Sequence, residues 1–139
     1  MQKEETQPPR DDARQGCKLI GIVLDRIGDK WTVMTVAALS NGPLRFNALM
    51  RSVSSVSHRM LTLTLRGLER DGMVKRTIYP TTSPKVEYEL TEMGCSLIEP
   101  LQALGKWAAV HGPLIEKAQD QYDRKALALK ADRESSRAC

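Results

Sequence analysis

The chain has 139 residues, 41% of them hydrophobic and 27% charged, and its 21 Lys and Arg residues against 17 Asp and Glu residues give a formal charge of +4. This composition predicts one ordinary globular domain. No apolar run approaches the roughly 20 residues of a membrane helix and no secretory signal is recognisable, so we expect a cytoplasmic protein with no membrane partner. Three cysteines without CxxC or zinc-finger spacing argue against a disulfide scaffold and a zinc site, and we expect no metal and no cofactor.

The excess positive charge lies in the middle of the chain. Residues 45–85 contain eight Lys and Arg residues but only Glu69 and Asp71 as acids, a local net charge of +6. A basic segment inside a folded domain, rather than in a tail, predicts a surface that binds polyanions. A solvated charged face is the alternative.

The N-terminal part is expected to be an arm followed by a helix. Residues 1–16 are polar and lack periodicity, which predicts a flexible arm. Residues 18–27 are expected to form a helix that ends at Gly28. Its apolar side chains cover more than one face, and this excess indicates a partner chain.

Three more helices follow in the sequence. The second is expected over about 30–40, and a short third helix over 46–53 carries apolar residues at helical spacing. Ser57 is a suitable N-cap for a fourth helix over about 58–71. Its buried stripe is expected to consist of Leu61, Leu65 and Leu68.

The pattern then changes from a helical period to a period of two. Residues 73–79 and 85–90 alternate around a Pro-bounded turn and predict a β-hairpin. A long helix is expected over about 91–111, bent at Pro100, with an apolar seam that commonly pairs helices. Gly112-Pro113 is expected to separate it from a last amphipathic stretch and a polar tail.

This order of elements is typical of a winged helix-turn-helix, so we expect an α+β, predominantly helical fold. In such a motif the second helix enters the major groove and needs hydrogen-bond donors on its outer face. The hairpin, or wing, lies along the DNA backbone and needs cations.

The stretch from Cys17 to about His111 resembles the HxlR-type transcriptional regulators, which are winged-helix dimers of MarR-like architecture. The matching motifs are Cys17 before the first helix, Ile27-Gly28-Asp29-Lys30-Trp31-Thr32, Gly42-Pro43-Leu44-Arg45-Phe46, Ser57-His58-Arg59-Met60-Leu61-Thr62, Leu68-Glu69-Arg70-Asp71-Gly72 and Val86-Glu87-Tyr88-Glu89-Leu90-Thr91. Two departures stand out, because Leu63-Thr64 occupies the place of the family's usual Gln-Arg and Gly67 that of a helix-favouring residue. The operator sequence therefore cannot be taken from relatives.

The resemblance implies a bacterial or archaeal repressor or activator that binds an inverted-repeat operator as a homodimer. It divides the chain into a flexible arm (1–16), an HxlR-type DNA-binding domain (17–112) and a C-terminal helix with a polar tail (113–139). Added N- and C-terminal helices would form the dimer, and the interface residues are expected to be Leu19, Ile22, Val23, Leu97, Leu101, Leu104 and Ala108.

Ten residues are expected to contact DNA. At the start and outer face of the fourth helix they are Ser57, His58, Arg59, Thr62 and Arg66; beside the third helix, Arg45 and Arg51; beside the wing, Lys75, Arg76 and Lys85. Leu63 offers only an apolar contact to a thymine methyl, which leaves base reading to its neighbours. Trp31 and Phe46 are expected in the core.

Cys17 is a candidate sensor. We expect it at the approach to the first helix, where helix-terminal amides and Lys18 would stabilise a thiolate. The resemblance implies the same role, since a matching cysteine in thiol-sensing members detects quinones, aldehydes or oxidants; a small electrophile or oxidant is thus a candidate effector. A small apolar packing residue is the alternative. Cys95 is expected to be structural, and Cys139 accessible.

An enzyme is not expected. The two histidines, His58 and His111, suggest no catalytic pairing, and no glycine spacing of a phosphate loop is present. A winged-helix module that binds protein or RNA, and a regulator that responds to a non-covalent ligand, remain alternatives. The basic outer face of the fourth helix favours duplex DNA, because a protein-docking face would show apolar anchors there.

Overall fold

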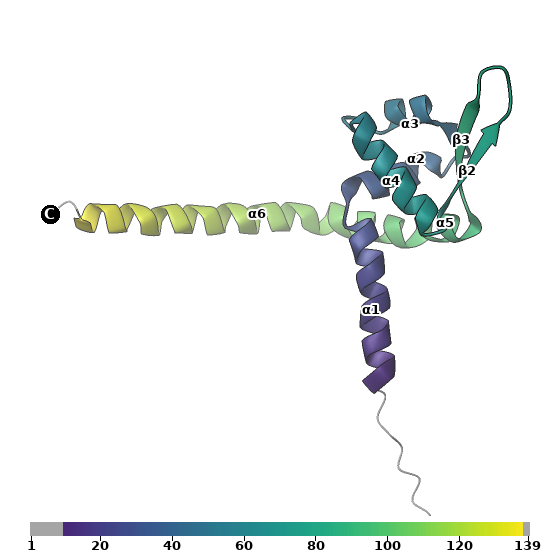
Figure 1. The fold of residues 1–139 in the computed structure, drawn as a ribbon. Helices are drawn as coiled ribbons and strands as arrows, with labels where there is room; N and C mark the ends of the chain where they lie inside the picture. Colours follow the sequence, from purple (N-terminus) through teal and green to yellow (C-terminus); the bar gives the residue numbers. More distant parts are fainter. Residues whose placement is uncertain (1–9, 138–139) are drawn as a thin grey trace, which may run out of the picture. The chain divides into compact units, whose positions relative to one another are not determined.

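The computed structural model describes residues 10–137. The chain forms two compact units, Met1–Ile98 and Glu99–Cys139. The first contains α1 (Arg10–Ile27), α2 (Lys30–Leu39), α3 (Phe46–Ser52), α4 (His58–Arg70), α5 (Glu92–Ser96) and a small sheet. The second contains α6 (Ile98–Arg137) from its second residue on (Figure 1).

Helix α1 begins eight residues earlier than expected. Residues 10–16 are therefore helical, and the prediction of a flexible arm is wrong for this segment. Residues 1–9 lie outside the described part of the chain. Residues 10–15 contain neither proline nor glycine, so their backbone allows the helix to continue from residues 18–27 toward the N-terminus. The helix ends before Gly28, as expected.

Side-chain caps fix the starts of α2 and α4. Asp29 accepts a hydrogen bond from the Trp31 amide at 2.9 Å, and Ser57 Oγ accepts one from the Met60 amide at 3.0 Å, which confirms the predicted cap. The turn between α3 and α4 contains Ser55 in the left-handed region, with φ of 69°. These features make α3 and α4 a helix-turn-helix.

The core lies between α2, α3, α4 and the base of the hairpin. The predicted stripe of α4 is confirmed, since Leu61, Leu65 and Leu68 are at most 2% exposed. The other fully buried apolar side chains come from α2, α3 and the loop that follows, namely Val36, Leu49 and Val53. Trp31 and Phe46 are only half-buried, so their expected place in the core is wrong.

The sheet has three antiparallel strands in the order β1-β3-β2. The predicted hairpin is confirmed as β2 (Val74–Tyr79) and β3 (Lys85–Leu90), and Figure 1 shows its tip reaching past the helices. Strand β1 (Leu44–Arg45) was not predicted; its Leu44 lies opposite Tyr88 of β3. The wing is thus tied to the segment that enters α3.

The C-terminal helices differ from expectation. The expected helix over 91–111 breaks at Leu97 into α5 and α6, and Pro100 falls in the first turn of α6, where a missing amide costs no helical bond. Gly112-Pro113 does not separate two stretches, because α6 continues through Pro113 to Arg137. The expected polar tail is helical to that point. No helix among residues 10–137 is long and apolar enough to cross a membrane.

Candidate nucleic-acid interface

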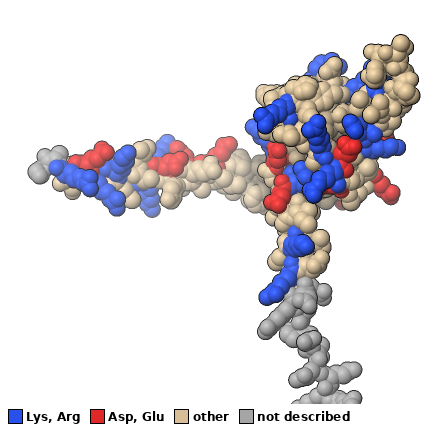
Figure 2. Space-filling view, in the orientation of Figure 1, with Lys and Arg blue, Asp and Glu red and all other residues tan. Residues whose placement is uncertain are grey.

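Helix α4 has two contrasting faces. Leu61, Thr64, Leu65 and Leu68 are buried against the rest of the unit. Arg59, Leu63, Arg66 and Arg70 are exposed and, with spacings of four, three and four residues, share the opposite face. Figure 2 shows basic side chains over the side of the unit that carries α4, with a few acidic ones among them. We call these four residues the outer face of α4.

Arg70 is the site residue that sequence reasoning missed. It lies four residues after Arg66, and this spacing was a sufficient signal. The outer face therefore presents three guanidinium groups around one leucine. Guanidinium groups bind both guanine edges and phosphate, often with two hydrogen bonds at once.

The start of α4 uses its polar groups within the chain. Thr62 Oγ1 donates to the His58 carbonyl oxygen at 2.8 Å, so its hydroxyl can accept a hydrogen bond from a base but has already given its proton. The His58 ring lies 4.6 Å from the Phe46 ring at an interplanar angle of 52°, which fixes the start of α4 against α3. The Ser57 hydroxyl accepts the cap bond, and within residues 10–137 its proton has no hydrogen-bond acceptor.

Arg45 directly precedes α3, and Arg51 lies in its last turn. Both are exposed, and with Asn47 they line a hollow of about 470 Å³. Glu87 of β3 lines the same hollow, opposite Arg45 across the sheet. Its carboxylate lowers the positive potential that a phosphate would meet there.

The three wing cations are not brought together on one face. Successive residues of a strand point to opposite sides, so Lys75 and Arg76 face opposite sides of the hairpin. Lys85 lies opposite Tyr79 and therefore on the side of Lys75. On the other side, Arg76 Nε lies 3.6 Å from Glu69 Oε1 of α4; both side chains are well exposed, so this pair is weak.

An ion pair joins α1 to the end of α4. Arg26 Nε donates to Asp71 Oδ2 at 2.5 Å, and the two side chains are 26% and 19% exposed. The guanidinium passes directly over Gly67, where an added Cβ would lie 1.9 Å from Arg26 Nη1. Gly67, the unusual glycine inside the helix, thus leaves the space that this Arg26–Asp71 bridge occupies.

A cavity of about 250 Å³ lies beside the bridge, between the end of α1, the start of α2 and α4. Asp25, Asp29, Met60 and Leu63 line it together with Thr64. The Thr64 residue is 4% exposed, and its hydroxyl has no hydrogen-bond partner among the described residues. A buried hydroxyl in this state favours a ligand or water in the cavity.

Cys17 is exposed, but its expected place at the approach to the first helix is wrong. It lies seven residues after the start of α1, so the free amides of the helix end are about two turns away. Cys95 is also exposed in the single chain, in α5, and its expected structural role stays a prediction. Cys139 lies outside the described residues.

The residues expected in the dimer interface lie on α1, at the break before α6 and on α6. Leu19, Ile22 and Val23 are 40–54% exposed, and on α6 Leu104 and Ala108 are exposed as well. Leu97 and Leu101 are half-buried. Apolar exposure of this extent is unusual for a chain that acts alone.

Comparison with known proteins points to one group. The sequence model of the HxlR-like helix-turn-helix family matches residues 26–116. An HTH-type transcriptional regulator of Methanothermobacter thermautotrophicus is 41% identical over 67% of this chain and 71% of its own length. YdeP, an HTH-type transcriptional regulator of Bacillus subtilis, is 38% identical over 87% of this chain and 88% of its own. The solved structure of the redox regulator HypR in its reduced form is similar with a TM-score of 0.65 and 39% identity, covering 70% of this chain and 97% of that one. These relatives are regulators of transcription and not enzymes.

Proposed function

Because the chain belongs to the HxlR-like helix-turn-helix family of transcriptional regulators, we propose that it is a homodimeric repressor that binds an inverted-repeat operator. Helix α4 enters the major groove and the hairpin lies along the neighbouring backbone. The observation that carries this proposal is the outer face of α4, where three exposed arginines lie opposite a fully buried leucine stripe.

Two kinds of DNA contact follow from the positions of the cations. Arg59, in the first turn of α4, is placed to read a base edge, because the first residues of a recognition helix reach furthest into the groove. Arg45, Arg51, Lys75 and Lys85 lie away from that helix and serve as phosphate contacts, which add affinity without sequence preference.

The homodimer is supported by α1. Its side chains Leu19, Ile20, Ile22, Val23 and Leu24 are all at least 40% exposed in the single chain. We infer that a second copy covers them, and that the two α4 helices of the dimer lie about one DNA turn apart, as an inverted repeat requires.

An electrophile or oxidant acting on Cys17 is the proposed signal. The thiol is exposed on α1, the same helix that carries the apolar dimer residues, so an adduct or an intersubunit link there would disturb the separation of the two α4 helices. The likeness to the redox regulator HypR supports this chemistry. A non-covalent ligand is the second candidate, favoured by the cavity beside α4 and its unpartnered Thr64 hydroxyl.

The test compares Arg59→Ala with Lys75→Ala on a duplex that the wild-type protein selects from a random pool, and on a scrambled duplex. Loss of a base contact costs about 1–3 kcal/mol, so Arg59→Ala should weaken selected DNA roughly 5- to 150-fold and scrambled DNA little. Lys75→Ala should weaken both equally and lower the salt dependence by about one ion per subunit. Equal losses on both duplexes for both variants would contradict the assignment.

A further inference from the structure

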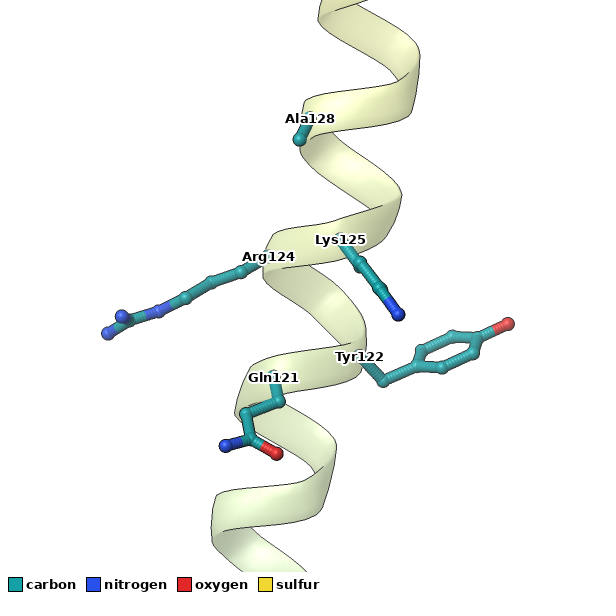
Figure 3. Close-up of a pocket in the computed structure, with 5 residues that line it drawn as sticks. All are labelled: Gln121, Tyr122, Arg124, Lys125 and Ala128. Atoms are coloured by element: carbon teal, nitrogen blue, oxygen red, sulfur yellow. The ribbon is translucent and has the colours of Figure 1, made fainter.

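The hollow on α6 is an open surface. It is lined by side chains of this single helix, namely Gln121, Tyr122, Arg124, Lys125 and Ala128. Figure 3 shows Tyr122 and Lys125 projecting to one side of the helix and Arg124 to the other. The cavity beside the Arg26–Asp71 bridge differs from this hollow, because the end of α1, the start of α2 and α4 enclose it together.

The cavity beside the bridge has an exposed side and a buried side. Asp25, Met60 and Leu63 are exposed, whereas Thr32 and Thr64 are 2% and 4% exposed. Its volume is about 250 Å³, and a water molecule takes up about 30 Å³ in the liquid, so the cavity has room for a small organic molecule. We call it the α1–α4 cavity.

The charge of the α1–α4 cavity favours a cation. Its charged lining residues are Asp25, Asp29 and Arg26, and the Arg26 guanidinium is already held in the bridge. Within residues 10–137 neither Asp25 nor Asp29 forms an ion pair. The ammonium of Lys30 lies over the Trp31 ring, 4.5 Å from its centre. Two carboxylates without a cationic partner attract a positively charged group.

The Thr64 hydroxyl is a buried polar group without a partner. Its oxygen has no hydrogen bond among the described residues, although the residue is 96% buried by its exposed fraction of 4%. Thr35, buried on α2, shows the ordinary situation, since its hydroxyl donates to the Trp31 carbonyl oxygen at 2.6 Å. Buried hydroxyls in native proteins are paired with protein or with a bound molecule, so a ligand with an N–H donor would complete Thr64.

The remaining wall of the α1–α4 cavity is apolar. Met60 and Leu63 of α4 line it and are 37% and 49% exposed. A hydrocarbon group gains from covering such side chains, whereas a hydrated metal ion does not. Residues 10–137 also contain no group of three or more His, Cys, Asp or Glu residues that could hold a metal ion. The cavity therefore suits an organic cation.

We propose that the α1–α4 cavity binds a small organic ammonium ion, which is the non-covalent ligand of the proposed function, on which its regulatory role rests. A primary ammonium has three N–H donors, and the cavity offers it the carboxylates of Asp25 and Asp29 and the hydroxyl of Thr64. Asp29 keeps one oxygen for this contact, because only its Oδ1 accepts the cap bond of α2. The hydrocarbon part covers Met60 and Leu63.

The bound ammonium ion acts on DNA binding through its position beside α4. Leu63 lines the α1–α4 cavity and also belongs to the outer face of α4. Two carboxylates beside that face repel phosphate, and an ammonium ion offsets their charge. The ligand therefore strengthens operator binding, and operator DNA strengthens ligand binding by the same factor.

Ligand binding is measured first on the full-length chain without DNA. The probes are cyclohexylammonium and n-butylammonium, with cyclohexanol, cyclohexanecarboxylate and magnesium chloride as neutral, anionic and inorganic controls. In amide NMR titrations the two amines should saturate and shift residues 25–32 and 60–64, and the controls should not. No saturable binding of either amine at millimolar concentrations, or equal binding of a control at these amides, would overturn the inference.

The variant Thr64→Val keeps the shape of the side chain and removes the hydroxyl. It should weaken cyclohexylammonium binding about tenfold or more, because a buried hydrogen bond to a charged group is lost. It should not lower the free energy of unfolding measured in urea without ligand, because the hydroxyl has no partner to lose. Wild-type amine affinity, or a loss of stability in this variant, would overturn the role of Thr64 and with it the inference.

Charge is tested by a matched pair of exposed aspartates. Asp25→Asn should weaken amine binding about threefold, a smaller loss because the carboxylate is screened by water. Asp123→Asn removes the same charge from α6 and should leave amine binding unchanged. Equal effects of the two variants would contradict a charge contact at the α1–α4 cavity.

The last measurement uses the duplex that the wild-type protein selects. Saturating cyclohexylammonium should lower its dissociation constant about twofold or more for wild type and leave it unchanged for Thr64→Val at the same amine concentration. A weaker or unchanged complex of wild type would overturn the regulatory role. A chain that binds the amines but selects no duplex would refute the proposed function while the amine site stands.

Discussion

Replacement of Gly67 by alanine sets two effects of opposite sign against each other. Alanine is favoured over glycine in a helix interior by about 1 kcal/mol, so α4 alone would be stabilised. The new Cβ, however, would lie 1.9 Å from Arg26 Nη1 and 2.6 Å from Cζ, so the guanidinium must shift, and we expect this shift to break its hydrogen bond to Asp71. A hydrogen bond between charged groups, here 26% and 19% exposed, is worth about 1.5–3 kcal/mol. We therefore expect Gly67→Ala to lower the free energy of unfolding by about 0.5–2 kcal/mol.

A double-mutant cycle isolates the cause. In an Arg26→Ala background no guanidinium occupies the space over residue 67, so Gly67→Ala should stabilise the protein by about 1 kcal/mol. The difference between the two backgrounds is the coupling, expected at about 1.5–3 kcal/mol. Urea unfolding at one fixed chain concentration measures each corner, with unchanged slopes required for the comparison. The same gain from Gly67→Ala in both backgrounds would refute the reasoning.

Three further outcomes are expected. Ser57→Ala removes the cap of α4 and should cost about 1 kcal/mol in urea unfolding, whereas an unchanged midpoint would contradict the role of its hydroxyl. Ile22→Glu places a charge on the exposed apolar face of α1 and should yield monomers in sedimentation that have lost operator binding; a dimer of normal affinity would exclude α1 from the interface. Treatment with a quinone or diamide should release operator DNA from wild type and from Cys95→Ser/Cys139→Ser but not from Cys17→Ser. Release that persists in Cys17→Ser would assign the signal elsewhere.

The sequence predicted best those elements that local interactions determine. Ser57 caps α4 through an amide three residues away, and the buried stripe of Leu61, Leu65 and Leu68 follows from helical period alone. The hairpin could be predicted equally well, because the residues along its two strands follow a period of two. The outer face of α4 followed from the position of that stripe, except for Arg70.

Contacts between residues far apart in the sequence could not be predicted from local sequence patterns. Strand β1 has two residues and exists because β3 pairs with it, and no periodicity can show in so short a segment. The Arg26–Asp71 bridge joins residues 45 positions apart, so Gly67 looked like a weak point of the helix rather than space for a side chain. Gly112-Pro113 indicated a helix end because proline costs about 3 kcal/mol inside a helix, yet the apolar pattern on both sides keeps one register and α6 continues.

The strand order β1-β3-β2 leaves β2 at the edge of the sheet with one side of its backbone unpaired. An open edge of six residues can accept a strand from another molecule, which is a common route to aggregation. Here the edge carries Lys75 and Arg76 in succession, on opposite faces, so a copy of the same strand added parallel and in register would bring like charges together on both sides. Lys75, which we propose as a phosphate contact, would therefore act together with Arg76 to disfavour pairing of the wing with a second copy of itself when the protein is concentrated and no DNA is bound.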